Sequence, residues 1–336
     1  MPKLKKRPTQ KQITRRKSAK PARPKKSRVG LLPLQTGDTV EIIAPGSYAP
    51  TEHLLKGIEI LKSWGFNVIH DPDILKPHIF LAQSDEYRFQ QFKKAMTNPE
   101  SRVIWCLRGG YGSIRLLPDI EKMKRPSKPK ILIGLSDVSS LQTVITQKWN
   151  FPTLHGPLID RLALERLTEQ NIVEVKNTLM NPGFVMSFKG LTGLNSVAKL
   201  KKTIKSSVVG GNLMVVTSTL GTPSQMKTDG KIIFLEEITE RAYRVDRCLQ
   251  QMKQAGLFKK AKAVVFGDFT NCVEPNGDNY IQEILQEFSQ GLKIPVYTGV
   301  ENGHGDLQRP LYFNSPATLK TSDRAELQVF SPFRKV

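Results

Sequence analysis

The sequence has 336 residues, of which 39% are hydrophobic, and it carries a formal net charge of +21. This is the composition of an ordinary globular protein, and the length predicts two domains or one large α/β domain. No apolar run is as long as the roughly 18 residues that a membrane-spanning helix needs. The basic N-terminus is not followed by an apolar segment of the kind found in a secretory signal.

The three cysteines, Cys106, Cys248 and Cys272, are an odd number at unrelated spacings. They match neither a disulfide framework nor a zinc site, which favours a reducing compartment. We therefore expect the protein to be cytoplasmic.

The positive charge is concentrated at the N-terminus. Residues 1–28 hold 13 of the 51 Lys and Arg residues and no Asp or Glu. A segment so charged and so poor in apolar groups cannot bury enough surface to fold, so we predict a disordered basic tail. It could contact an anionic polymer or a membrane surface through non-specific electrostatics, or it could simply be a solubilising extension.

The first part of the remaining chain alternates strand-like and helix-like segments. Apolar runs predict strands at 39–44, 67–71, 102–110 and 130–134. Apolar residues at helical spacing, with caps at their ends, predict helices at 51–66, 84–98, 113–120 and 138–150. Such alternation implies parallel βαβ units, which bind ligands at the carboxyl ends of their strands.

The pattern weakens at residues 162–196, which we interpret as a linker between an N-terminal domain at 29–161 and a C-terminal domain at 197–336. Beyond the linker, one long helix is predicted at 241–256. Strands are predicted at 231–238, 261–269, 294–300 and 325–332.

A serine and an aspartate stand at one of the predicted strand exits. In "KILIGLSDVSSLQ" the apolar strand ends at Gly134, and Ser136 and Asp137 precede the next helix. This is the position of a nucleophile elbow, although the second glycine of G-x-S-x-G is absent. Taken alone, a Ser-Asp pair before a helix is more often an N-cap.

A second strand exit carries the Gly-rich turn "RGGYGS", which includes Gly110. Backbone N–H groups in such a turn can bind an anion or a developing oxyanion. The turn is neither a Walker A loop nor a complete dinucleotide fingerprint, and taken alone it is more often a turn that simply requires positive φ.

A serine nucleophile needs a base and an orienting acid. Among the five histidines, His304 lies in the glycine loop "ENGHGD", whereas His155 is flanked by apolar residues and is expected to make structural hydrogen bonds. Glu236 ends an apolar strand and could orient an imidazole, with Glu237 as the adjacent alternative. Strand alternation allows only one of these two glutamates to face the site.

Together these stretches resemble the LD-carboxypeptidase family of serine peptidases, which includes the self-immunity peptidases that inactivate microcin C. The resemblance covers about residues 36–332. Its blocks occur in order: "GDTVEIIAPGS", "RGGYGSIRLLP", "GLSDVSSLQ", "HGP", "GGNLMVVTSTLGTP", "LEEITERAYRVDRCLQQM" and "GHGD".

The resemblance implies an α/β fold with a parallel-sheet, Rossmann- or flavodoxin-like N-terminal domain. The C-terminal α/β domain would carry a small mixed or barrel-like sheet. The implied catalytic triad is Ser136 as nucleophile, His304 as base and Glu236 as orienter, with the backbone N–H groups of Gly110 and Asp137 as the oxyanion hole.

The implied reaction removes the terminal D-alanine from a cell-wall tetrapeptide, during peptidoglycan recycling. The substrate would be a muropeptide, no cofactor or metal would be needed, and a homodimer is suggested. Two other readings stay open: a peptidase of the same fold that cleaves an aminoacyl-nucleotide antibiotic, and a non-catalytic binding protein.

Overall fold

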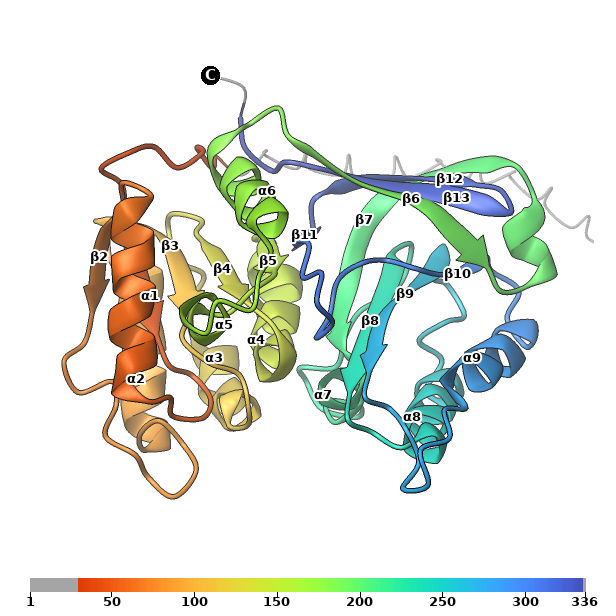
Figure 1. The fold of residues 1–336 in the computed structure, drawn as a ribbon, viewed down its shortest axis with the longest axis horizontal. Coiled ribbons are helices and arrows are strands. Elements are labelled where there is room, and N and C mark those ends of the chain that lie inside the picture. The colour runs from red at the N-terminus through yellow and green to blue at the C-terminus, as the bar shows by residue number, and fades with distance from the viewer. Residues whose placement is uncertain (1–29, 335–336) are drawn as a thin grey trace, which may run out of the picture.

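The computed structural model describes residues 30–334, so the predicted basic tail lies outside the described residues. The chain forms two β-structures side by side (Figure 1): a six-stranded sheet built mostly from the N-terminal half, and a closed seven-stranded barrel. The predicted α/β class, with a parallel sheet followed by a mixed, barrel-like sheet, is confirmed.

The first sheet has the strand order β11-β5-β4-β3-β1-β2. All neighbours are parallel except β11, which runs antiparallel to β5. The order 2-1-3-4-5 is that of flavodoxin-like folds, whose topological switch point lies between β1 and β3. The strands are β1 (Thr39–Ile43), β2 (Asn67–His70), β3 (Ser101–Cys106), β4 (Ile131–Gly134), β5 (Thr153–His155) and β11 (Leu311–Phe313).

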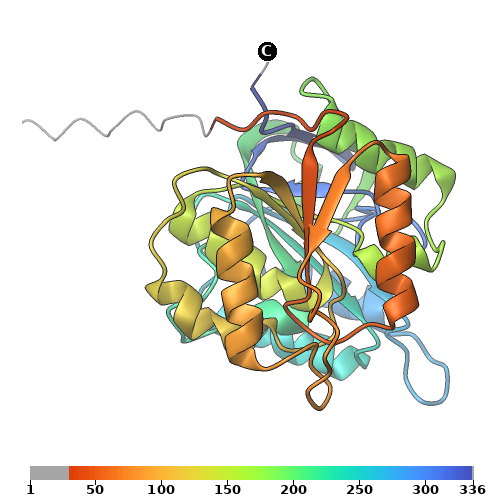
Figure 2. The same cartoon turned by 90° about the vertical axis from the view of Figure 1, so that its left-hand side faces the viewer.

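Helices cover both faces of this sheet, as Figure 2 shows for α1 and α2 on opposite sides. Alternate strand residues supply the two cores: Ile131 and Ile133 of β4 pack with α1 and α5, whereas Leu132 packs with α2, α3 and α4. Residues 136–149 form one continuous helical run that begins as a 3-10 turn and ends as a π-helix. The helical elements here are α1 (Thr51–Ser63), α2 (Asp85–Thr97), η1 (Ser113–Leu116), α3 (Leu117–Lys122), η2 (Ser136–Val138), α4 (Ser139–Val144), η3 (Ile145–Trp149) and α5 (Ile159–Ala163).

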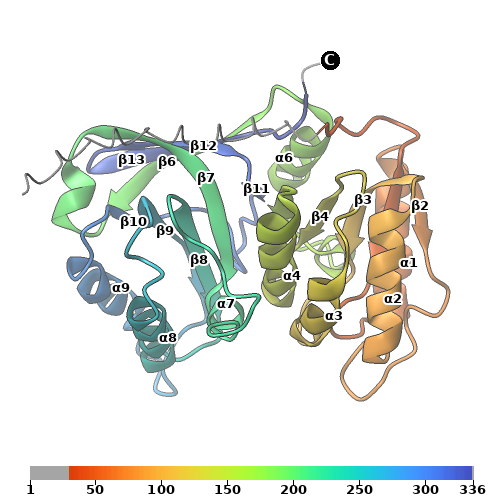
Figure 3. The same ribbon diagram turned by 180° about the vertical axis from the view of Figure 1, so that it is seen from behind.

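The barrel has the order β10-β6-β13-β12-β7-β8-β9 and closes between β9 and β10. Strands β7, β8, β9 and β10 are parallel, and the other pairs are antiparallel. The helices α7, α8 and α9 lie together along one side of the barrel (Figure 3) and share an apolar core with its strands. The elements are β6 (Val185–Gly193), η4 (Ser196–Lys199), β7 (Lys202–Asn212), α7 (Leu213–Thr217), β8 (Ile232–Ile238), α8 (Ala242–Gln254), β9 (Ala263–Thr270), α9 (Ile281–Gln290), β10 (Val296–Thr298), β12 (Pro316–Thr321) and β13 (Arg324–Phe330).

The segment that the sequence suggested as a linker, 162–196, contains regular structure. It holds helix α6 (Glu169–Met180) and strand β6, which is a full member of the barrel. In the other direction, β11 comes from the C-terminal half and completes the first sheet. The division of the chain into domains at these boundaries stays a prediction.

One apolar core runs from the first sheet into the barrel interior. At its centre the ring of His155 stacks on Phe313 at a centroid distance of 5.1 Å and meets the edge of Phe234 at 5.5 Å. These three side chains come from β5, β11 and β8, so the contact joins the two β-structures. Within residues 30–334, no helix combines the length and apolarity needed to cross a membrane.

This junction leads to a stability prediction. Replacing Phe313, which is 1% exposed, with alanine should lower the free energy of unfolding by about 3–5 kcal/mol, because the cavity would open where the two sheets meet. The matched change Phe330→Ala, at a ring that is 36% exposed on β13, should cost clearly less. Denaturant unfolding of both variants measures the difference, and equal losses would contradict the assigned role of the junction.

Candidate active site

Ser136 occupies a sharp turn between β4 and the helical run 136–149. Its φ angle is +63°, in the left-handed region that non-glycine residues rarely adopt. The preceding Gly134 leaves no room for a side chain, because a Cβ there would lie 2.6 Å from Val138 Cγ1. Such a strained strand-to-helix turn presents its side chain outward, as a nucleophile elbow does. Ser136 is half-buried, and its Oγ makes no hydrogen bond among the residues that the structure describes.

The Gly-rich turn after β3 passes directly against this serine. A Cβ on Gly109 would lie 3.1 Å from Ser136 Cβ and 3.5 Å from its Oγ. Gly110 is exposed with φ +80°, a conformation suited to glycine. The turn is held by the loop after β1, since Ser47 N–H donates to the Gly109 carbonyl at 2.9 Å and Ser47 Oγ accepts from Tyr111 N–H at 3.1 Å. The exits of β1, β3 and β4 therefore meet beside Ser136.

The side chain of Asp137 points into the protein and fixes this turn. Its Oδ2 accepts a hydrogen bond from Ser113 N–H at 2.8 Å, and the residue is 3% exposed. Burial raises the pKa of this carboxyl, although the hydrogen bonds and the buried Arg88 act in the opposite direction. Arg88 in turn donates to the Pro45 carbonyl. The carboxylate of Asp137 therefore holds the Gly-rich turn in place from inside the protein.

Glu236 and His304 form the central contact of the site. His304 Nδ1 lies 2.7 Å from Glu236 Oε2, and the carboxylate is completely buried at the end of β8. Burial alone would lower the pKa of His304, but the charge and hydrogen bond of Glu236 outweigh it, so the net pKa is raised. With Nδ1 committed to the carboxylate, Nε2 is left to act on a substrate or nucleophile.

The positions on either side of His304 leave no room for a side chain, which explains why both are glycine. Gly303 has φ +143°, and a Cβ on it would lie 3.1 Å from both Glu236 Oε2 and Asp268 Cβ. A Cβ on Gly305 would lie 2.7 Å from Asp268 Oδ2. Burial, followed by the charge of Glu236, raises the pKa of Asp268 to about 7. The "GHGD" loop is therefore packed closely onto two carboxyl groups.

The adjacent Glu237 faces elsewhere. Its carboxylate accepts hydrogen bonds from Asn212 Nδ2 at 2.7 Å and from the backbone N–H groups of Met214 and Ile238 at 2.8 and 2.9 Å. These partners lie at the start of α7 and in β8 itself, so Glu237 ties the two elements together. Burial raises its pKa to about 7. Of the two glutamates, Glu236 is the one that contacts His304.

Several contacts bring the serine and the Glu236–His304 pair to the same junction. Ser139 Oγ, in the run that begins at Ser136, accepts from Asn212 N–H at 3.0 Å, and Asn212 pairs with Glu236 across β7 and β8. On the other side, Gly134 pairs with His155, whose Nε2 lies 3.9 Å from Glu236 Oε1. The sequence-predicted residues thus come from both β-structures and gather where these meet.

His155 makes a structural hydrogen bond, as the sequence suggested, and its Nδ1 lies 3.1 Å from Gln142 Oε1. Its proximity to Glu236 was not foreseen. Asp268 and Arg161 were also missed; Arg161 Nη2 donates to the Gly305 carbonyl at 2.9 Å. The only sequence signal for Asp268 is an acid directly after the apolar run of β9, a position similar to that of Glu236.

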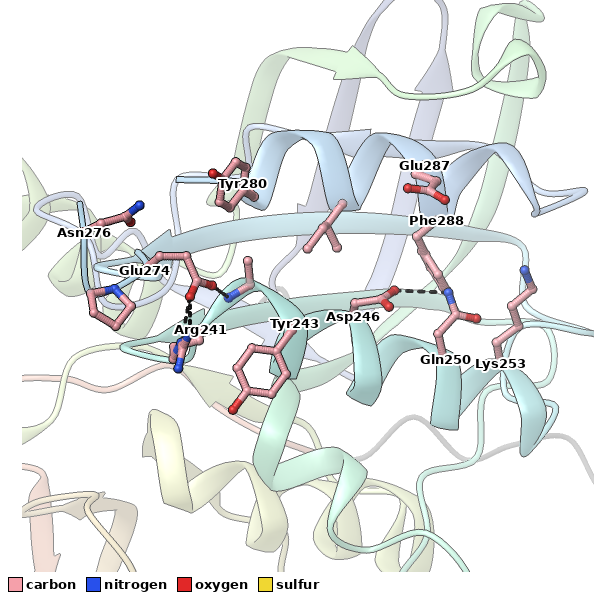
Figure 4. Close-up of a pocket in the computed structure, with 13 residues that line it drawn as sticks. Arg241, Tyr243, Asp246, Gln250, Lys253, Glu274, Asn276, Tyr280, Glu287 and Phe288 are labelled. Carbon is pink, nitrogen blue, oxygen red and sulfur yellow. Dashed lines mark hydrogen bonds and ion pairs between the residues drawn. The ribbon is translucent and has the colours of Figure 1, made fainter. Parts of the chain in front are cut away.

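A groove of about 770 Å³ lies away from these residues, between α8 and α9 (Figure 4). Arg241 and Glu274 close one end of it with an ion pair, and Phe288 lines the other. None of the candidate catalytic residues lines this groove. Within the described part of the chain, no three His, Cys, Asp or Glu side chains are grouped so as to hold a metal ion.

Comparison with known proteins identifies the family. Family models of the LD-carboxypeptidase N-terminal and C-terminal domains match residues 40–156 and 205–319. A putative carboxypeptidase of Rickettsia conorii is 34% identical over 248 residues, which cover 74% of this chain and 77% of the relative. The chain belongs to the LD-carboxypeptidase family. It is accordingly a serine-type hydrolase.

Solved structures of similar proteins share this architecture. The muramoyltetrapeptide carboxypeptidase of Oxalobacter formigenes is 29% identical, with a TM-score of 0.76 over 88% of this chain and all of that one. The microcin C7 self-immunity protein MccF superimposes with a TM-score of 0.78 over 91% of this chain and all of that one. The two sequences are 21% identical, so this similarity shows only that the proteins share a fold.

The close packing around Gly303 leads to a prediction about the activity of this LD-carboxypeptidase. Gly303→Ala should lower carboxypeptidase kcat/KM by about 10- to 100-fold, because the new Cβ would displace the His304 loop from Glu236. Gly277→Ala is the matched control, since Gly277 also has positive φ but has no atom within 4 Å of its Cβ position. Steady-state kinetics of both variants should separate the effect of the new Cβ contact from the effect of a strained backbone at positive φ. Equal losses of kcat/KM in the two variants would refute the steric argument.

Proposed function

We propose that this enzyme hydrolyses the peptide bond between the L-centre of a diamino acid and a terminal D-alanine in cell-wall tetrapeptides. In this proposal Ser136 is the nucleophile, His304 the base and Glu236 its orienter. The observation that carries the assignment is the 2.7 Å contact between His304 Nδ1 and Glu236 Oε2. This contact selects the tautomer with a proton on Nδ1 and a free Nε2, as a serine hydrolase requires.

The first half of the reaction forms an acyl-enzyme. Ser136 Oγ attacks the carbonyl carbon while its proton passes to His304 Nε2, and the carbonyl electrons move onto oxygen. When the tetrahedral intermediate collapses, the C–N bond breaks and His304 gives the proton to the departing D-alanine amine. The raised pKa of His304 suits both steps, because Glu236 stabilises the intermediate imidazolium.

The second half releases the tripeptide. A water molecule gives a proton to His304 Nε2 and attacks the ester carbon, and the C–O bond to Ser136 then breaks as the serine regains its proton. In both halves the oxyanion would be held by the backbone N–H groups of Gly110 and Asp137. The packing of the Gly109–Gly110 turn against the Ser136 side chain supports this placement.

The substrate class rests on the relatives. A protein named muramoyltetrapeptide carboxypeptidase shares 29% identity with this chain over 88% of its length, which supports a murein tetrapeptide. A role in peptidoglycan recycling would follow from this substrate. The homodimer stays an expectation from the family resemblance. The cytoplasmic location and the contact of residues 1–28 with an anionic polymer stay predictions from the sequence.

The proposal is tested by mass spectrometry of muropeptides incubated with the protein. The wild type should convert tetrapeptide to tripeptide with release of D-alanine, and Ser136→Ala should abolish turnover without changing the circular dichroism spectrum. Turnover that survives this substitution would remove the serine mechanism. Cleavage of an aminoacyl-nucleotide in place of the tetrapeptide would reassign the substrate.

The neighbouring glutamates provide a matched pair of variants. Glu236→Gln should lower kcat by about 100-fold or more with little loss of stability, because an amide no longer selects the productive His304 tautomer. Glu237→Gln should mainly lower the free energy of unfolding, by about 1–3 kcal/mol, because one of its accepting oxygens becomes a donor. The reverse pattern of activity and stability would exchange the two assignments.

The pH dependence follows from the same contact. His304 must be neutral to accept the serine proton, and Glu236 raises its pKa above the ordinary value of about 6.5. Below the raised pKa the base is protonated, so kcat/KM should fall about tenfold per pH unit as the pH drops. The profile is measured with tetrapeptide between about pH 5 and pH 9. An acid limb centred below about pH 6.5 would contradict the coupling.

A further inference from the structure

The environment of His155 fixes which of its nitrogens carries a proton. Gln142 Nε2 donates to two carbonyls, that of Gly134 at 3.0 Å and that of Leu154 at 2.9 Å. These bonds use both amide hydrogens, so Gln142 cannot be flipped and its Oε1 must face His155 Nδ1. An amide oxygen only accepts, and His155 Nδ1 therefore carries the hydrogen.

The other ring nitrogen then faces a carboxylate oxygen. His155 Nε2 lies 3.9 Å from Glu236 Oε1, both atoms are buried, and neither has a hydrogen-bond partner among the described residues. The ring cannot turn away, because Phe313 stacks on one face and Phe234 packs against it. In the neutral tautomer a lone pair of the ring nitrogen would face a lone pair of the carboxylate oxygen in a buried position, an arrangement that is costly without a proton.

We propose that His155 and Glu236 hold one proton between Nε2 and Oε1, and that His155 is a positioning residue that sets the charge of the catalytic carboxyl. The inference rests on the proposed roles of Ser136, Glu236 and His304. With this proton the pair is neutral as a whole, whether it is written as an acid beside an imidazole or as an ion pair. The distance of 3.9 Å needs to shorten by only about 1 Å to become a hydrogen bond.

The surroundings favour such sharing over an isolated charge. Burial lowers the pKa of His155 to about 4, although the charge of Glu236 acts in the opposite direction, so a full imidazolium charge is disfavoured at neutral pH. Two further acids lie near Glu236, the buried Glu237 on β8 and the half-buried Asp268 on β9, and burial and the charge of Glu236 raise the pKa of each to about 7. The cations near this cluster are His304 itself and Arg161 on α5, which acts on His304. One shared proton therefore removes a negative charge where few cations offset it.

The shared proton has a consequence for the base. A neutral Glu236–His155 pair attracts a proton on His304 less strongly than a free carboxylate does. Replacing His155 with a side chain that cannot share the proton leaves Glu236 with its full charge. His304 then becomes protonated at a higher pH, and because the base must be neutral, activity is lost at a higher pH.

The first test compares the pH profiles of two variants that disturb the same packing. In His155→Gln the acid limb of kcat/KM should move up by about 1 pH unit relative to the wild type. Phe313→Leu exchanges the stacked ring for a bulky aliphatic side chain that, with Phe234, still confines His155. It removes neither of the groups that share the proton, so its acid limb should stay in place even if kcat falls. A His155→Gln variant that loses activity equally at all pH values would show a merely structural role and overturn the proposal.

The second test does not depend on turnover. In the wild-type protein labelled with 15N histidine and with 13C in the Glu carboxyl groups, NMR should show either a protonated His155 Nε2 or a protonated Glu236 at pH 7. The signal should disappear or shift in Glu236→Gln, which assigns it. A bare Nε2 beside an ionised Glu236 would overturn the proposal. A protein with this NMR signature but no tetrapeptide cleavage would instead refute the proposed function and leave the shared proton intact.

Discussion

The architecture of the site depends on one completely buried carboxylate. Glu236 is placed by β8 at the junction of the sheet and the barrel, where water cannot solvate it. A charge in such a position is tolerated only with partners of suitable geometry. His304 supplies one such partner at 2.7 Å, on a loop whose flanking glycines allow it to lie against the carboxylate. The loop, the strand and the junction therefore have to fold together.

The strand that carries Glu236 also explains how two successive glutamates can both be buried. The pairing of β8 with β9 shifts register between Leu235 and Glu237, which marks a bulge at this point. Glu236 faces His304, whereas Glu237 accepts two hydrogen bonds at the start of α7 and a third from Ile238 N–H in β8. The sequence predicted that only one of them would face the site, and Glu236 is the one in contact with His304. Which one it is depends on the pairing of β8 with its neighbours, a tertiary property.

Local chemistry made part of this site predictable and left the rest hidden. A strand that ends in Gly-Leu-Ser-Asp before a helix specifies a turn, and the positive φ of Ser136 is the outcome. Strand β11 could not be recognised in the same way, because three residues carry no periodic signal and its pairing with β5 joins positions far apart in the chain. His155 was interpreted as a structural residue because its flanking residues are apolar; its approach to Glu236 exists only after β5 and β8 meet.

The two β-structures converge because each presents the carboxyl ends of parallel strands to the same place. Gly110 and Ser136 follow β3 and β4 in the sheet, whereas Glu236 and Asp268 come from the ends of β8 and β9 in the barrel. Parallel strands bind ligands at these ends because their exit loops and helix starts present backbone N–H groups and polar side chains. Strand β11 links the two β-structures, because the chain runs from the His304 loop directly into β11, which pairs with β5 in the sheet. The proposed nucleophile from one unit and the proposed base from the other can then act together, provided that the aromatic contact of Phe313 with His155 and Phe234 holds the junction closed.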